Sequence, residues 1–244
     1  MTQSMFTEPE ERVALREAVK KLAGKYGREY VEKQAREGGK MTEMWLEMGQ
    51  TGFLGVNIPD QYGGGGGGMS DLAAVLEESA AAGAPLLMMV VSPAICGSII
   101  ARCGTEEQKQ RWLPSIADGT HLMAFGITEA DAGSNSHKIT TTANRDGDGW
   151  TLKGQKTFIS GVDEAQSVLI VARTEDAKTG KLKPALFVVP TDAEGFTKQP
   201  IEMAWSAPEK QFTLFLDEVR LPADALVGDE DGGLWQLFAG LNPE

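Results

Sequence analysis

The sequence predicts an α+β fold, in which an N-terminal all-α domain precedes an antiparallel β-sandwich or barrel. Two observations predict it. Up to about residue 120, apolar side chains recur at spacings of three and four, as on one face of a helix. After His121, short β-rich segments follow one another without helical pattern between them, which excludes a parallel βαβ sheet. We therefore expect a helical domain at 1–120, a β domain at 121–232 and the start of a truncated helical domain at 233–244.

The first helix is expected at 8–34, with Gly38-Gly39 as its stop signal. Its apolar face would consist of Leu15, Ala18, Leu22, Tyr26 and Tyr30. The most apolar stretch, 84–100, contains prolines and a glycine. These residues favour one or two buried helices over a membrane span.

Capping signals mark the other helices. Thr42 can cap a short helix through Met48, and Ser70 can cap the next one. Thr105 and Gln108 have the spacing of a capping box. The six glycines at 63–68 are too flexible for the interior of an element, so we interpret them as a surface connection. The alternative is a mobile loop near a ligand.

The β domain is expected to consist of short strands joined by tight turns. Asp146-Gly147-Asp148-Gly149 is typical of a hairpin turn between two of them. The segments with strand character are 122–128, 139–144, 150–153, 157–160, 167–173, 185–190 and 211–216.

Composition excludes several classes of partner. The 244 residues include 23 Lys and Arg against 35 Asp and Glu, for a net charge of −12. This acidity argues against nucleic acid or an anionic membrane as the main partner, but it leaves a phosphorylated ligand open. Cys96 and Cys103 form no disulfide or metal motif, so no metal site is expected. Together with the lack of a signal-peptide pattern, they favour the cytoplasm.

The first candidate ligand site is the segment 125–134, where an apolar strand ends in hydroxyl, acidic and glycine residues. Such a turn can present successive backbone N–H groups and the Ser134 hydroxyl to an anionic oxygen. The P-loop and GxGxxG patterns are both absent. Taken alone, the segment is more typical of a polar strand-to-loop turn.

The second candidate segment is 154–161. If it is a strand, Phe158 and Ser160 point to the same side, because the period is two. An aromatic face beside a hydroxyl suits a planar heteroaromatic ring with a polar edge. Ordinary strand alternation is the alternative for this segment.

Together these segments resemble the acyl-CoA dehydrogenase family. Further similarity lies in G-F-L-G-V at 52–56 and L-V-G at 226–228. The motifs that carry the resemblance are T-E-A-D-A-G-S-N at 128–135, D-G-D-G-W-T-L-K-G-Q-K at 146–156, F-I-S at 158–160 and F-L-D-E-V-R-L-P at 215–222. Ala130, Asn135 and the Met203-Ala204-Trp205 turn depart from the family pattern.

The resemblance implies a helical domain and an antiparallel β domain of the acyl-CoA dehydrogenase type, normally followed by a helical bundle. It implies FAD as cofactor and oxidation of an acyl-CoA to the trans-2-enoyl-CoA. A carboxylate base takes the α-proton, and the electrons pass to an electron-transfer flavoprotein. Relatives are usually tetramers. The family's base lies outside the residues matched here, so no catalytic residue is assigned, and this chain alone is expected to be inactive.

Carried over residue by residue, the resemblance places Phe125, Ile127 and Thr128 along the flavin ring. Gly133 and Ser134 would approach the FAD pyrophosphate, and Ser134 would also reach the CoA. The remaining cofactor-binding residues would be Phe158, stacked near the ring, Ile159 beside it, and Ser160, whose hydroxyl would donate toward N5.

Glu129 and Asp131 are carboxylates within the same loop, and we interpret them as structural. Two other functions stay open. One is a flavin oxidase or monooxygenase on the same fold, and the other is a non-catalytic truncated subunit that acts with a larger partner.

Overall fold

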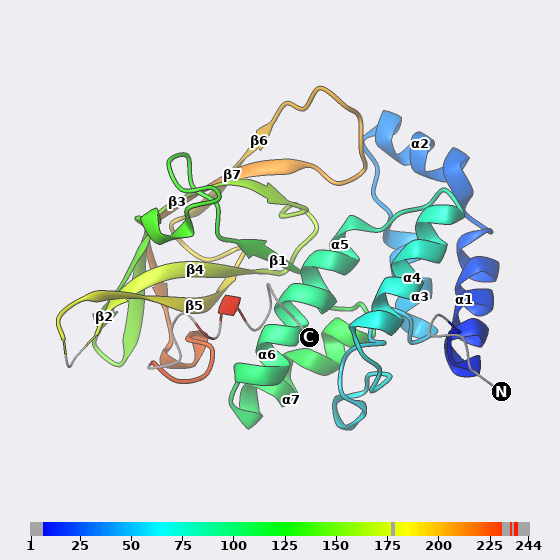
Figure 1. Cartoon of the computed structure of the whole chain (residues 1–244). Coiled ribbons are helices and arrows are strands. Elements are labelled where there is room, and N and C mark those ends of the chain that lie inside the picture. Colours follow the sequence, from blue (N-terminus) through cyan, green and yellow to red (C-terminus); the bar gives the residue numbers. More distant parts are fainter. Residues whose placement is uncertain (1–6, 177–178, 231–234, 236, 239–244) are drawn as a thin grey trace.

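The computed structural model describes residues 7–176, 179–230, 235, 237 and 238. Helices fill one half of the molecule and strands the other (Figure 1), which confirms the predicted fold class. No helix in the described part is both long and apolar enough to cross a membrane. The helix expected at 233–244 lies almost wholly outside these residues.

The helix predicted at 8–34 is in fact two helices, α1 (Glu10–Ala23) and α2 (Gly27–Glu37). The chain turns at Gly24, and Gly27 has φ +66°, a left-handed value that favours glycine and interrupts a helix. The α2 helix ends at Gly38, which is left-handed as well. The apolar spacing continued across the break and concealed it.

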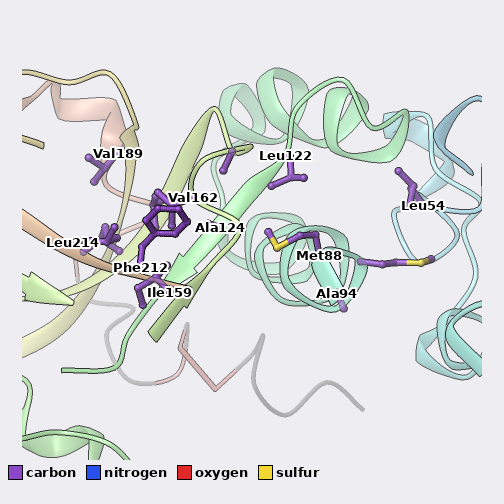
Figure 2. Packing of buried hydrophobic residues seen from close by; sticks show 14 of the residues in the cluster. Leu54, Met88, Ala94, Leu122, Ala124, Ile159, Val162, Val189, Phe212 and Leu214 are labelled. Carbon is purple, nitrogen blue, oxygen red and sulfur yellow. The ribbon is translucent and has the colours of Figure 1, made fainter. Parts of the chain in front are cut away.

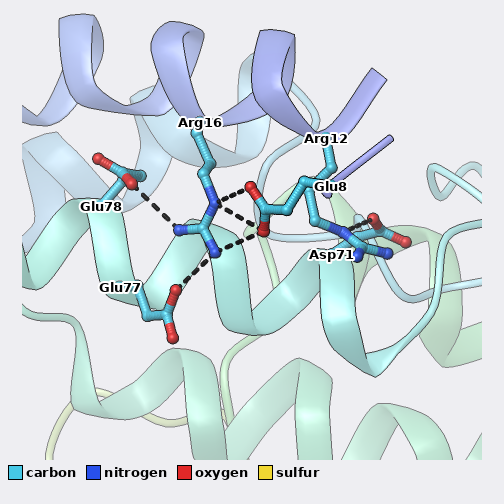
Figure 3. Close-up of polar contacts among 6 residues, drawn as sticks. All are labelled: Glu8, Arg12, Arg16, Asp71, Glu77 and Glu78. Carbon is cyan, nitrogen blue, oxygen red and sulfur yellow. Dashed lines mark hydrogen bonds and ion pairs between the residues drawn. The ribbon is translucent and has the colours of Figure 1, made fainter. Parts of the chain in front are cut away.

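A network of ion pairs joins α1 to α4 (Met69–Ala81) along their exposed edge (Figure 3). Arg16 pairs with Glu8, Glu77 and Glu78, and Arg12 pairs with Asp71 at 2.9 Å. Asp71 also accepts a hydrogen bond from the N–H of Gly68, so it caps the helix in place of the predicted Ser70.

The remaining helices form the junction with the β half. Thr42 begins α3 (Thr42–Gln50) as its first helical residue rather than as its cap. The apolar stretch forms α5 (Leu87–Met89), a π-helix (Val90–Gly97) that contains Pro93, and α6 (Ser98–Cys103). The capping box predicted at Thr105 is confirmed at the start of α7 (Glu106–Ala117).

The β half is one seven-stranded sheet. Its strands are β1 (Met123–Gly126), β2 (Thr142–Asp146), β3 (Gly149–Ser160), β4 (Ser167–Glu175), β5 (Leu182–Pro190), β6 (Phe196–Ile201) and β7 (Gln211–Leu221). The hairpin turn predicted at 146–149 joins β2 to β3. The segments 150–153 and 157–160, predicted separately, belong to the single long strand β3.

The sheet is mixed rather than purely antiparallel. Both β1 and β2 run parallel to β4, while β5 pairs with β4 antiparallel along its whole length. Gly126 of β1 lies opposite Ile170 of β4, and Thr142 of β2 lies opposite Arg173. The strands β1 and β2 therefore follow each other along one side of β4, and the segment 127–141 leaves the sheet between them.

The two halves share a buried core. Ile159, Val162, Phe212 and Leu214 from the β half belong to the same cluster as Met88 from the helical half (Figure 2). Leu122 and Ala124, just before and within β1, also belong to this cluster (Figure 2). The start of β1 is thus fixed by packing on both sides, and it directs the chain toward the segment 127–134.

Candidate functional site

The two candidate segments lie side by side. The N–H of Thr157 donates to the carbonyl oxygen of Thr128 at 2.9 Å. Lys156 Nζ donates to the carbonyl oxygen of Ile127 at 3.2 Å. The end of β1 and the later part of β3 therefore form one continuous wall, which agrees with the resemblance, since it places residues of both segments along one ring.

Phe158 stands out from this wall on a β-bulge. Between Lys156 and Ile159 the pairing of β3 with β7 shifts by one residue, so Thr157 and Phe158 together oppose Thr213. Phe158 has φ +57°, which is a strained backbone conformation for an aromatic residue, and its side chain is 60% exposed. Strain of this kind persists where the surroundings enforce it, and it is concentrated at functional sites.

The other predicted residues lie on different faces of their strands. Ile159 is buried in the core together with Ala124 (Figure 2), so only its backbone could reach a cofactor. Phe125 and Ile127 are half-buried and pack against the second core cluster, on the opposite face of β1 from Ala124.

Hydroxyl groups line the polar side of the wall. Ser160 Oγ accepts a hydrogen bond from Gln211 Nε2 at 2.8 Å and can donate to Gln211 Oε1 at 3.2 Å. Thr128 is partly exposed. A ligand acceptor at Ser160 would compete only with the longer of the two contacts to Gln211, a residue that the sequence analysis did not select.

Gly133 and Ser134 lie exposed in the loop that separates β1 from β2. A methyl group placed at Gly133 would meet no atom within 4 Å, so a bulky group can approach its backbone freely. Asp131 of the same loop is also exposed. The loop thus offers accessible backbone and hydroxyl groups beside the wall, as the anion-binding interpretation requires.

Glu129, at the start of this loop, is bonded to the two residues at its end. Its carboxylate accepts hydrogen bonds from the N–H and hydroxyl of Thr140, at 2.6 and 2.8 Å, and from those of Thr141, at 3.0 and 2.6 Å. Lys156 Nζ donates to it at 2.8 Å. The geometry agrees with the structural interpretation of Glu129.

The ion pair is strongly buried, with Lys156 at 0% and Glu129 at 7% exposure. Burial alone would raise the pKa of Glu129, but the hydrogen bonds from Lys156, Thr141 and Thr140 outweigh it and lower the pKa to about 2. Burial lowers the pKa of Lys156, and the neighbouring carboxylate opposes that shift. Glu129 therefore stays ionised, and its low pKa makes it too weak a base to take a proton near neutral pH.

Lys156 is a second site residue, after Gln211, that sequence reasoning missed. It lies in strand register with the core residues Trp150 and Leu152, and all three are buried. A lysine at a core-facing strand position needs a buried partner, and this requirement was the signal in the sequence that an acidic residue lies beside it.

A separate hollow of about 330 Å³ lies between α3 and the segment 161–166. Trp45 and Met88 give it an apolar side, and Asp163, Glu164 and Glu209 give it an acidic one. None of the predicted cofactor residues lines it. Among the residues that the structure describes, no group of His, Cys, Asp or Glu side chains is placed to hold a metal ion.

Comparison with known proteins gives the same family as the motifs. The acyl-CoA dehydrogenase N-terminal domain matches residues 9–120, and the acyl-CoA dehydrogenase middle domain matches residues 124–219. Acyl-CoA dehydrogenase FadE12 of Mycobacterium tuberculosis is 65% identical over all 244 residues, which correspond to 63% of its own length.

Solved structures agree. A glutaryl-CoA dehydrogenase from Mycobacterium smegmatis in complex with FADH2 has a TM-score of 0.84 at 30% identity, over 96% of this chain and 59% of that one. The glutaryl-CoA complex of a glutaryl-coenzyme A dehydrogenase has a TM-score of 0.88 at 28% identity, over 98% of this chain and 62% of that one. The resemblance carried by the motifs is confirmed, and the chain belongs to the acyl-CoA dehydrogenase family.

Proposed function

We propose that this chain is the flavin-binding part of an FAD-dependent acyl-CoA dehydrogenase, which converts an acyl-CoA thioester to the trans-2-enoyl-CoA. The observation that carries the proposal is the wall formed where Thr157 bonds to Thr128, on a strand that also carries the exposed ring of Phe158 and the Ser160 hydroxyl. Membership of the family and the FADH2 named for the similar glutaryl-CoA dehydrogenase support FAD as the cofactor.

The residues on this wall fit such a cofactor. The ring of Phe158 offers an exposed aromatic surface, while Ser160 and Thr128 offer hydroxyl groups for the polar edge of a flavin. Gly133 leaves its backbone open to a diphosphate, and Ser134 is exposed beside it for the diphosphate or the CoA. We propose Phe125, Ile127 and the backbone of Ile159 as the apolar support of the ring.

When bound, FAD supplies the acceptor for the substrate's β-hydrogen. The chain's own contribution is to orient the flavin and to exclude water from it. Phe158 would cover one part of the ring, and the Ser160 hydroxyl, oriented by Gln211, would hold a proton at the edge where negative charge develops. The base that takes the α-proton is not assigned among these residues, and Glu129 is unsuited because its low pKa makes it a weak base and its oxygens already accept hydrogen bonds.

The electron acceptor, the assembly and the location extend the same proposal. We propose that electrons pass to an electron-transfer flavoprotein and that the protein forms a homo-oligomer, a tetramer as the resemblance implies. The cytoplasm remains the location that the cysteine pattern favours. The chain spans 63% of the length of the FadE12 relative, so we expect these 244 residues alone to bind FAD weakly and not to turn over.

Flavin absorbance and acyl-CoA-dependent dye reduction test the proposal. The experiment compares the 244-residue chain with the same chain extended by the C-terminal part of its FadE12 relative. We expect the extended protein to hold FAD and to reduce the dye when an acyl-CoA is added. Oxygen consumption without reduction of an electron-transfer flavoprotein would favour the oxidase alternative, and the absence of any bound flavin would overturn the proposal.

A further inference from the structure

The buried ion pair between Glu129 and Lys156 lies where three segments of the chain meet. Glu129 belongs to the start of the loop between β1 and β2, and its carboxylate binds Thr140 and Thr141 at the end of that loop. Lys156 belongs to β3 and reaches both Glu129 and the carbonyl oxygen of Ile127. The contact thus lies at the point where the chain leaves the sheet and where it returns.

The first consequence concerns the loop 130–139. Its two ends are held by one carboxylate, and the N–H groups of Glu129 and Ala132 each donate to the other's carbonyl oxygen, which makes a tight turn at its start. Gly133 and Ser134 follow this turn directly. Their place beside the wall therefore depends on where the Glu129 carboxylate is held.

The second consequence concerns the bulge at Phe158. The residues on either side of Thr157 and Phe158 are both buried, with Lys156 held by its ion pair and Ile159 held in the core. The backbone between them is bonded to Thr128 through the N–H of Thr157. A left-handed aromatic residue needs this kind of external constraint, because its unconstrained backbone would return to the extended region.

We propose that Glu129 and Lys156 are positioning residues of the flavin site, which hold the loop with Gly133 and Ser134 and the bulge with Phe158 in one fixed arrangement. The inference rests on the proposed function for the identity of the ligand. It assigns no contact with the ligand to either residue. The pair acts through Thr140 and Thr141 on one side and through Thr157 on the other.

The test separates positioning from stability with a neutral double variant. Lys156→Met alone leaves a buried carboxylate without its cation, which strongly destabilises a fold. Glu129→Gln combined with Lys156→Met removes both charges, and the glutamine oxygen can still accept from one of the two threonines, Thr140 or Thr141. We expect this double variant to keep a melting temperature near that of the unchanged chain, since neutral replacements of buried ion pairs are often tolerated.

The first readout is amide hydrogen exchange at Thr157, whose N–H is bonded to Thr128 and to neither of the replaced residues. In the double variant we expect this amide to exchange about tenfold faster relative to β4, because the wall loses its cross-connection. The second readout is FAD affinity by fluorescence titration, in which we expect the dissociation constant to rise about tenfold or more. Leu72→Ala, in the core of α4, is the control that should lower the melting temperature and leave both readouts unchanged.

The outcomes are distinguishable. A double variant with unchanged Thr157 exchange and unchanged FAD affinity overturns the positioning role. If Leu72→Ala changes both readouts as strongly as the double variant, the effect is general destabilisation, and the inference fails as well. If the unchanged chain and its extended form bind no FAD, the proposed function fails, while the Thr157 exchange still decides whether the pair fixes the wall.

Discussion

Two carboxylates outside the strands of the β half, Glu129 and Glu164, differ in their chemistry. Glu129, at the base of the loop, receives five hydrogen bonds, and its pKa is lowered to about 2. The pKa of Glu164, in the acidic hollow beside α3, is raised to about 7, mainly because burial disfavours its charged form. The neighbouring carboxylates Asp163 and Glu209 raise this pKa further, while Lys40 and Lys210 lower it. Donors directed at the carboxylate, rather than depth alone, decide whether a buried acid is ionised.

The difference matters for function. The loop region is built to hold a fixed charge, which suits a rigid wall for a cofactor. In the hollow, the acidic side chains lie close together and few positive groups neutralise them. Lys40 donates to the carbonyl oxygen of Asp163 at 2.8 Å and lies 3.4 Å from its carboxylate. The other carboxylate oxygen of Asp163 has no hydrogen-bond partner. Stability should therefore respond to pH in opposite directions in the two regions.

The largest expected effect comes from Lys156→Met. Removing the cation leaves the buried carboxylate of Glu129 uncompensated, which should cost about 3–5 kcal/mol of the free energy of unfolding. Lys153→Met on the same strand is the matched control, since its pair with Glu218 is about two-thirds exposed and should contribute about 0–1 kcal/mol. Chemical denaturation of both variants measures the contrast, and equal losses would contradict the special place of Lys156.

Glu129→Gln should change the acid limb of the stability profile. The folded pKa of Glu129 lies near 2, below its ordinary value of 4.5, so its ionisation stabilises the fold above pH 4.5. This contribution disappears as the pH falls from 4.5 toward about 2. At pH 7 the free energy of unfolding of the glutamine variant should be lower by about 2–3 kcal/mol, and it should decline less steeply as the pH falls. Unfolding midpoints at pH 7 and pH 3 test this, and a constant difference between the two proteins would contradict it.

Glu164→Gln should act with the opposite sign. The folded state keeps a proton on Glu164 up to about pH 7, whereas the unfolded chain releases it near 4.5. Stability should therefore fall as the pH rises between these values, and the glutamine variant should remove that fall. We expect the variant to be more stable by about 1–3 kcal/mol at pH 8 and nearly unchanged at pH 4. Glu194→Gln, at an exposed position, is the control, and a stabilisation that is the same at both pH values would argue against titration of Glu164.

The parts of the molecule that follow local rules were predictable from sequence. The capping box at Thr105 and the hairpin turn at Asp146–Gly149 depend on neighbouring residues, and both stand as predicted. That the segments near 125–134 and 158–160 lie together was predicted only through the resemblance, because no local pattern relates residues so distant in the chain.

What was missed depends on tertiary context. Strand β6 has mostly exposed residues and contains Pro200, so it lacks the alternation that marks a strand with one buried face. The helix break at Gly27 was not predicted because the apolar spacing continues across it. The bulge at Phe158 was not predicted because the sequence around it is typical of a regular strand. The β2–β3 hairpin lies between β1 and β4 in the sequence, yet β1 and β4 pair directly and in parallel. No local sequence pattern predicts this pairing.

The smallest expected effect on stability, with the most informative effect on binding, comes from Phe158→Gly. Glycine adopts φ +57° without strain, and the exposed ring of Phe158 contributes little to the core, so the two changes should nearly cancel to within about 1 kcal/mol. If the ring covers the flavin, FAD affinity should nevertheless fall by about tenfold or more. Phe215→Gly removes a ring from β7 at a position with an ordinary negative φ, so it should destabilise the strand without this effect on FAD. Unchanged FAD affinity in Phe158→Gly would mean that the strained bulge serves the fold of the wall and not the cofactor.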